Sequence, residues 1–168
     1  MKKDYIVTIL LLALLGLGMV LRAFTGGAAK ENEHWCIKAA EQGNVKAQRA
    51  LGVCYILGKD VKKDPEKGIF WLTKAAEQND LDSLFLLGSC YYEGEGVKKD
   101  YKQAVHWFAK AADQGHPMAQ YAMGDCCMNG RGVKRDIKKA KYWYSKAAEQ
   151  GNEDAKKALQ ALSKLKKR

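Results

Sequence analysis

The feature that most constrains the fold of this chain is a repeat of 36 residues. The tripeptide Lys-Ala-Ala occurs four times at this spacing, at 38–40, 74–76, 110–112 and 146–148. All four tryptophans keep the same step, at Trp35, Trp71, Trp107 and Trp143. Units that recur at such a period bury their apolar sides against one another, so the sequence predicts a stack of similar units.

Two helices are predicted within each unit. In residues 80–115, apolar side chains recur at helical spacing in two stretches. The first contains Leu86, Leu87, Cys90 and Tyr91, and the second contains Ala104, Trp107, Phe108 and Ala111. The chain has only two prolines, and its valine, isoleucine and threonine residues are too scattered to form strands. We therefore expect an all-α fold, an α-solenoid of antiparallel helix pairs, preceded by an N-terminal apolar helix.

Residues that begin and end helices mark the boundaries of the units. Helix-capping side chains are expected at Asn44, Asp80, His116 and Asn152 for the first helices and at Asp64, Asp100 and Asp136 for the second. Pro65 and Pro117 fit first helical positions, and Gly58, Gly94 and Gly130 fit helix ends. The predicted repeat domain, residues 30–168, has a half repeat at 31–43, repeats at 44–79, 80–115 and 116–151, and a capping helix at 152–165.

Three glycines occupy one position inside the first helix of successive repeats. They are Gly52, Gly88 and Gly124. Glycine inside a helix costs about 1 kcal/mol relative to alanine, so its recurrence needs a cause. We expect a neighbouring helix to approach closely at each of these residues.

Residues 80–115 contain Leu87-Gly88 through Gly94-Glu95-Gly96-Val97, followed by Trp107-Phe108-Ala109-Lys110-Ala111-Ala112. This pattern resembles the Sel1-like repeat, a relative of the tetratricopeptide repeat. The resemblance covers about residues 31–165 and implies a right-handed superhelix that acts as a protein-interaction scaffold. Three residues depart from the pattern: Asp60 replaces a glycine, Cys127 a tyrosine and Gln160 a glycine. We expect the loop at Asp60 to be shifted or strained.

The N-terminal residues 1–29 are predicted to form a targeting segment. Lys2 and Lys3 precede an apolar run from Ile6 to Leu21. The run is long for a signal peptide and nearly reaches the 17–25 residues or so that span a bilayer. An uncleaved single-pass anchor is favoured over a cleaved signal peptide. The repeat domain would then face the periplasm or exterior at the cell membrane, or be periplasmic or secreted after cleavage.

No set of residues with catalytic chemistry accompanies the repeat. His34, His106 and His116 lack metal-binding spacing, and Ser163 with Lys166 matches Ser-x-x-Lys without any partner motif. The sequence predicts no catalytic residue, no metal and no cofactor. A cell-wall-active or β-lactamase-like hydrolase is the alternative that the family resemblance brings in.

The five cysteines are predicted to be small apolar residues without a disulfide. Cys54, Cys90 and Cys126 share one position in successive repeats. Packed helices lie about 8–10 Å apart, whereas the Cα atoms of a disulfide lie within about 4.4–6.8 Å. Cys36 and Cys54 are expected to be out of register, and the adjacent residues Cys126 and Cys127 rarely form a disulfide.

A binding face is expected on the first helices, which line the concave surface of stacked repeats. The candidate residues for a protein or peptide partner are Arg49, Val53, Ile56, Phe85, Ser89, Tyr92, Tyr121, Asp125 and Met128. For Phe85 and Tyr121, packing within the array is an equal alternative.

A second candidate is a ladder of basic loop residues, one pair in each repeat. The pairs are Lys62-Lys63, Lys98-Lys99 and Lys134-Arg135. They suit a solvated edge, or alternatively an anionic membrane surface or peptidoglycan. The net charge of +10 does not indicate nucleic-acid binding, because residues 1–30 contribute +3 and residues 152–168 contribute +4.

Overall fold

The computed structural model describes residues 36–165, which form an array of helix pairs. Residues 36–41 are helical, and seven further helices of 13 residues each follow. They are α3 (Val45–Leu57), α4 (Pro65–Glu77), α5 (Leu81–Glu93), α6 (Tyr101–Asp113), α7 (Pro117–Asn129), α8 (Ile137–Glu149) and α9 (Glu153–Leu165). The predicted all-α array of sequential helix pairs is confirmed.

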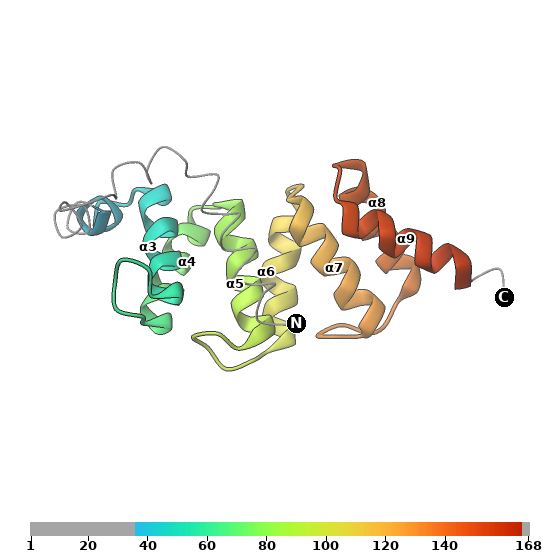
Figure 1. Cartoon of the computed structure of the whole chain (residues 1–168), viewed down its shortest axis with the longest axis horizontal. Helices are drawn as coiled ribbons and strands as arrows, with labels where there is room; N and C mark the ends of the chain where they lie inside the picture. The colour runs from blue at the N-terminus through green and yellow to red at the C-terminus, as the bar shows by residue number, and fades with distance from the viewer. Residues whose placement is uncertain (1–35, 166–168) are drawn as a thin grey trace.

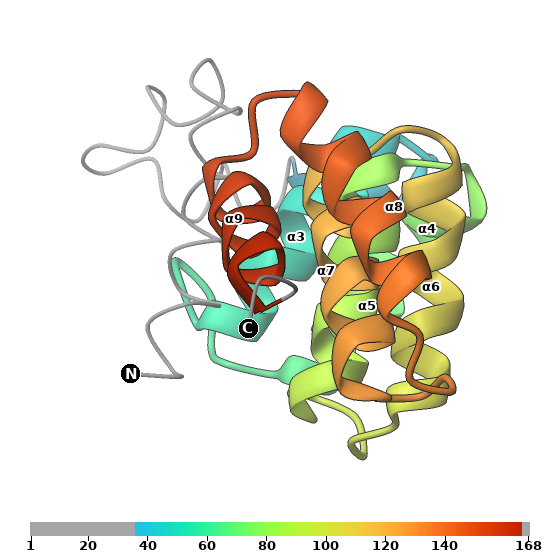
Figure 2. The ribbon, with the colours of Figure 1, turned by 90° about the vertical axis from the view of Figure 1, so that its right-hand side faces the viewer.

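The helices are arranged side by side along the longest axis of the molecule, from α3 to α9 (Figure 1). Each pair packs together, α3 with α4, α5 with α6 and α7 with α8, and each pair also packs against the next. Viewed along the array, α4, α6 and α8 lie on one side, while α3 and α7 lie toward α9 (Figure 2). The array therefore has two faces, one made by first helices and one by second helices.

The predicted N-terminal segment, residues 1–29 with the apolar run from Ile6 to Leu21, lies outside the described residues. Within residues 36–165, no helix has both the length and the apolar character needed to cross a membrane.

The predicted helix boundaries are confirmed. The side chains of Asn44, Asp80 and His116 accept hydrogen bonds from the backbone at the starts of α3, α5 and α7, and Asp64, Asp100 and Asp136 do so at α4, α6 and α8. Asn152 accepts from the amide of Ala155 at the start of α9. Gly58, Gly94 and Gly130 end their helices in the left-handed conformation. Each cap thus accepts from one or two of the four N–H groups that a helix start leaves without an intrahelical partner.

The glycines inside the first helices make room for the second helix of the same repeat. A Cβ on Gly88 would lie 2.4 Å from the ring of Phe108, and one on Gly124 would lie 2.5 Å from the ring of Tyr144. In the first repeat the corresponding neighbour of Gly52 is Leu72, at 2.8 Å. The close approach predicted from the sequence is confirmed, and one side chain of the second helix fills each gap.

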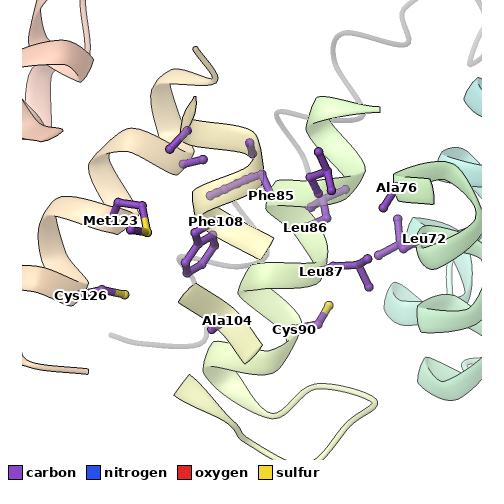
Figure 3. Close-up of a cluster of buried hydrophobic side chains, with 14 of the residues drawn as sticks. Leu72, Ala76, Phe85, Leu86, Leu87, Cys90, Ala104, Phe108, Met123 and Cys126 are labelled. Carbon is purple, nitrogen blue, oxygen red and sulfur yellow. The ribbon is translucent and has the colours of Figure 1, made fainter. Parts of the chain in front are cut away.

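The core continues from one repeat to the next through these side chains. Leu87 points toward Leu72 of α4, while Phe108 lies on the side toward Met123 of α7 (Figure 3). Leu72 and Leu87 are fully buried and Phe108 nearly so. Because each unit supplies only part of this core, no repeat can bury its apolar residues without a neighbour.

The loops after the first helices touch the preceding repeat. Gly132 has a φ of +72°, and a Cβ there would lie 2.1 Å from the carbonyl oxygen of Tyr101. Gly96 approaches Pro65 in the same way. The equivalent residue Asp60 also adopts a positive φ, +61°. The expected strain at Asp60 is therefore present, in a conformation that aspartate tolerates better than most residues.

Candidate partner-binding face

Six of the nine predicted binding residues are half-buried on the first-helix face, the side of the array formed by α3, α5 and α7. They are Arg49, Ser89, Tyr92, Tyr121, Asp125 and Met128. Half-buried side chains are partly open to solvent and are also held by their neighbours, which suits a surface that contacts a partner.

The other three residues, Val53, Ile56 and Phe85, are buried. This corrects the prediction of a binding role for Val53 and Ile56, and for Phe85 it favours the alternative of packing within the array. Val53 and Ile56 are 1% and 2% exposed. Ile56 fills the space beside Gly68 of α4, where a Cβ would lie 2.4 Å from its side chain. Phe85 stacks on the ring of His116 at 5.0 Å and packs near Phe108 (Figure 3). These three residues stabilise the array and cannot contact a partner directly.

Arg49 belongs to a charged chain that joins the starts of successive first helices. Its guanidinium pairs with Asp80 at 2.9 Å and also with Asp82. Asp82 is within 3.3 Å of Nε2 of His116, whose Nδ1 accepts the amide hydrogen of Ala119 at 3.2 Å. With Nδ1 accepting, the proton of the neutral ring lies on Nε2 and is donated to Asp82. The chain links α3, α5 and α7 and so fixes the geometry of this face.

Removing the His116 ring is expected to destabilise the array at neutral pH. His116→Ala loses the cap of α7, a cost of about 1 kcal/mol. The hydrogen bond from His116 holds the pKa of Asp82 below its ordinary value; partial burial opposes this shift and Arg49 supports it. Because that pKa is lowered on folding, the stabilisation is complete above about pH 4 and is lost as pH falls through the folded pKa.

Urea unfolding followed by circular dichroism across pH 3–7 would measure both effects. His116→Asn is the matched control, since it keeps a capping acceptor while losing, as His116→Ala does, the ring contacts with Asp82 and Phe85. At pH 7 we expect His116→Asn to lose about 1 kcal/mol less stability than His116→Ala, because it keeps the cap. Both variants should lose less stability than the wild type as the pH falls from 5 to 3. A loss at pH 7 of the same size in the two variants would contradict the capping role.

The polar centre of the first-helix face is the carboxylate of Asp125 in α7. It accepts a hydrogen bond from the Tyr144 hydroxyl at 2.5 Å and another from Tyr121. Burial raises the pKa of Asp125, while the two tyrosine hydroxyls act in the opposite direction. Burial also raises the pKa of Tyr144, so its hydroxyl remains a donor at neutral pH. The carboxylate is thus held in a fixed orientation with part of its surface open.

A second polar group, the guanidinium of Arg131, lies near Asp125, where the loop after α7 meets the preceding repeat. The guanidinium of Arg131 lies over the rings of Tyr92, at 5.4 Å, and Tyr101, at 5.8 Å, and donates to the hydroxyl of Tyr92. The charge of Arg131 also lowers the pKa of Asp125, which places the two groups within electrostatic reach. We call Tyr92, Tyr101, Tyr121, Asp125, Arg131 and Tyr144 the Asp125 site.

Sequence reasoning had identified three members of this site, Tyr92, Tyr121 and Asp125. It missed Arg131, Tyr101 and Tyr144, because they come from a loop and from second helices. The one available signal was Arg131 itself, since the corresponding positions hold Lys59 and Glu95. Arginine next to aromatic residues is characteristic of interaction surfaces.

In the basic loop ladder, one residue of each pair makes a local contact. Lys63 pairs with Glu95 at 3.0 Å, and the ammonium of Lys99 lies 5.8 Å from the centre of the Tyr101 ring. Arg135 donates from Nε to the carbonyl oxygen of Met128 at 3.0 Å. These contacts fit the solvated-edge interpretation better than a row of free cations.

The remaining sequence candidates lie apart from the Asp125 site. The hydroxyl of Ser163 donates to the carbonyl oxygen of Gln160 within α9. His106 is exposed on α6, while His34 lies outside the described residues. The cysteines are free thiols, and burial raises the pKa of both Cys90 and Cys126 to about 12. Over residues 36–165, no three His, Cys, Asp or Glu side chains are grouped as metal ligands would be.

Comparison with known families identifies the repeat. The Sel1 repeat model matches residues 33–44, 45–80, 81–116 and 117–152. The chain belongs to the Sel1 repeat family. Its first match is a partial repeat, followed by three full Sel1 repeats of 36 residues each.

Solved structures of other Sel1-like proteins are similar to this one. A structure of c5321, described as a protective antigen of uropathogenic Escherichia coli with this fold, is 40% identical with a TM-score of 0.77. The match covers 83% of this chain and 31% of c5321, so the chain spans about a third of that protein.

Two shorter proteins are matched over most of their length. A Sel1 repeat protein from Oxalobacter formigenes is 37% identical with a TM-score of 0.68, over 70% of this chain and 90% of that one. Helicobacter pylori cysteine-rich protein B is 28% identical with a TM-score of 0.58, over 76% of this chain and 91% of that protein. No curated protein matches the chain.

Proposed function

We propose that this Sel1 repeat chain is a non-enzymatic interaction scaffold of the cell envelope that binds a protein or peptide at the Asp125 site. The observation that carries the proposal is the half-buried Asp125 carboxylate beside the Arg131 guanidinium, with tyrosine rings around both. Such a site offers an acceptor, a donor and apolar ring surface within one patch.

The contacts within the site favour binding because they hold the side chains before a partner arrives. Two tyrosine hydroxyls orient Asp125, and two rings orient Arg131. A side chain that is already ordered loses little conformational entropy on binding, whereas an immobilised flexible one costs about 0.5–1.5 kcal/mol. Tyrosine and arginine are also the residues that most often dominate interface energies.

The partner that suits this chemistry is an extended protein segment. Asp125 can accept from a backbone amide or a basic side chain, and Arg131 can donate to a carbonyl or carboxylate. The rings of Tyr92 and Tyr121 offer apolar surface to the partner's side chains that lie between these polar contacts. Stacked repeats offer extended concave surfaces, which suit a segment of this kind.

The proposal includes where the array acts and how it is shaped. Residues 1–29 would anchor the chain in the cell membrane, with the Sel1 repeats facing the periplasm or exterior. The right-handed superhelix implied by the family resemblance would make the first-helix face concave. Arg49, Ser89 and Met128 would then line the same surface as the Asp125 site.

The test is quantitative capture of partners from the envelope of cells that produce the protein. The double variant Asp125→Asn, Arg131→Ala is compared with the wild type after reversible crosslinking and mass spectrometry. Loss of a residue that dominates an interface costs 2 kcal/mol or more, about a thirtyfold loss of affinity. We therefore expect at least one protein to be recovered with the wild type and lost with the variant.

Asp113→Asn is the matched control, since Asp113 is an exposed carboxylate at the end of α6. It should retain every partner. Circular dichroism shows whether each variant stays folded. An unchanged set of partners with a folded double variant would contradict the proposal.

A further inference from the structure

The second-helix face carries an exposed ring at one position in each repeat. Phe70 of α4 and Tyr142 of α8 are 52% and 53% exposed, and His106 occupies the same place in α6. Each ring meets the following tryptophan edge-on, with centroids 5.1–5.2 Å apart. The tryptophan fixes the ring in an outward position, so its exposure is a built feature of the repeat.

The charge around these rings increases along the array. On a helix, the surface neighbours of a residue are those three and four positions away. For Phe70 they are Glu66, Lys67, Thr73 and Lys74, with a net charge of +1. For His106 they are Lys102, Gln103, Ala109 and Lys110, at +2, and for Tyr142 they are Lys138, Lys139, Ser145 and Lys146, at +3.

Of the lysines around Tyr142, Lys138 and Lys139 lie within electrostatic reach of Asp136 but form no ion pair with it. Lys138, Lys139 and Lys146 are exposed, and none of them pairs with a carboxylate of the described residues. Near Phe70, by contrast, Lys67 pairs with Asp64 at 3.5 Å. Lys138 and Lys139 are held at the start of α8, where Asp136 accepts from their backbone amides at 2.9 and 3.0 Å. We call Tyr142 with these three lysines the Tyr142 patch.

We propose that the Tyr142 patch docks on an anionic bilayer surface. A tyrosine ring surrounded by ammonium groups matches the headgroup region, where the ring enters the interface and the lysines meet lipid phosphates. Lys146 already lies 5.4 Å from the centre of the Tyr142 ring, and its aliphatic stem extends the apolar surface. The apolar run from Ile6 to Leu21 nearly reaches the length that spans a bilayer, and as the proposed anchor it would keep the patch close to a membrane.

The surface around the patch is open enough for headgroups. Arg135, Asp136, Ile137 and Lys138 line a shallow depression of about 360 Å³ at the start of α8. Ile137 is itself 42% exposed there. Docking through Tyr142 would leave Asp125 free, because Tyr142 is exposed whereas Tyr144, two residues further along α8, is buried and donates to Asp125. The membrane contact is therefore a separate property from partner binding.

The test places a fluorescent amino acid at position 142 of the full chain and measures quenching by lipids that carry a nitroxide. The chain is reconstituted with nanodiscs of phosphatidylcholine alone, or with about a third phosphatidylglycerol. The same probe at position 70 is the matched control, because Phe70 has the same exposure and the same tryptophan contact but fewer free charges. We expect strong quenching at 142 in anionic discs, and weak quenching at 142 in neutral discs and at 70 in both.

Changing Lys138, Lys139 and Lys146 to glutamine should release the patch. Each lysine near an anionic surface contributes about a fivefold increase in affinity, so we expect the ratio of docked to undocked chain to fall about a hundredfold. Quenching at 142 no stronger than at 70, quenching independent of anionic lipid, or no association with anionic discs would each overturn the proposal. An acidic protein as the true occupant would produce the first of these results.

Discussion

Gly132→Ala is expected to lower the free energy of unfolding by about 3 kcal/mol, the sum of two separate penalties. The first is the positive φ of +72°, which an L side chain adopts at a cost of about 1–2 kcal/mol. The second is the approach of the new Cβ to within 2.1 Å of the backbone oxygen of Tyr101. A backbone atom cannot rotate away, so the loop must move and separate the second and third repeats.

Gly115→Ala is the matched control for this prediction. Gly115 has a φ of +92°, but nothing lies within 4 Å of the position that its Cβ would take. It should therefore show only the conformational penalty, about 1 kcal/mol. Urea unfolding of the two variants would measure the difference. Equal losses would show that the loop has room at Gly132 and that the repeats do not meet there as described.

Phe108→Ala should be the most destabilising single change in the core, with a loss of about 4 kcal/mol. The ring is 3% exposed and lies 5.8 Å from Phe85 and 6.2 Å from Tyr92, measured between centroids. It also fills the space left by Gly88. Its loss opens a cavity between α5, α6 and the next repeat, and thermal or urea unfolding would report it.

Phe70→Ala provides the control, because it removes the same side chain from an exposed site and should cost much less. A double variant adds a sharper test of the packing. Gly88→Ala alone forces a clash with Phe108, whereas in a Phe108→Ala background the added methyl group enters the cavity. We expect the two changes to couple by about 1–2 kcal/mol. Simple additivity would contradict the contact between the two residues.

Most of the fold could be predicted because its determinants are local and recur. The caps at Asp100 and Asp136 and the helix end at Gly94 depend only on nearby backbone groups, so spacing alone identified them. Gly88 and Gly124 signalled a close helix because glycine inside a helix needs a compensating contact. The neighbours that fill those gaps, Phe108 and Tyr144, required the structure.

The binding face was predicted less well because it depends on the rotation of each repeat against the next. Helical spacing places Val53 and Phe85 on the same stripe as Ser89 and Asp125 but does not show which of them a neighbour covers. His116 of the following repeat covers Phe85. Arg131 reaches Tyr92 across a repeat boundary, 39 residues earlier in the chain, and no local pattern encodes that contact.

The most direct test of the proposed function is site-specific photo-crosslinking in cells that produce the full chain. A photoreactive amino acid replaces Met128, one turn beyond Asp125 on the first-helix face, or His106 on the second-helix face. We predict that a discrete protein crosslinks from position 128 and not from 106, and that Arg131→Ala abolishes the crosslink. A protein that crosslinks equally from both positions, or from 106 alone, would contradict partner binding at the Asp125 site.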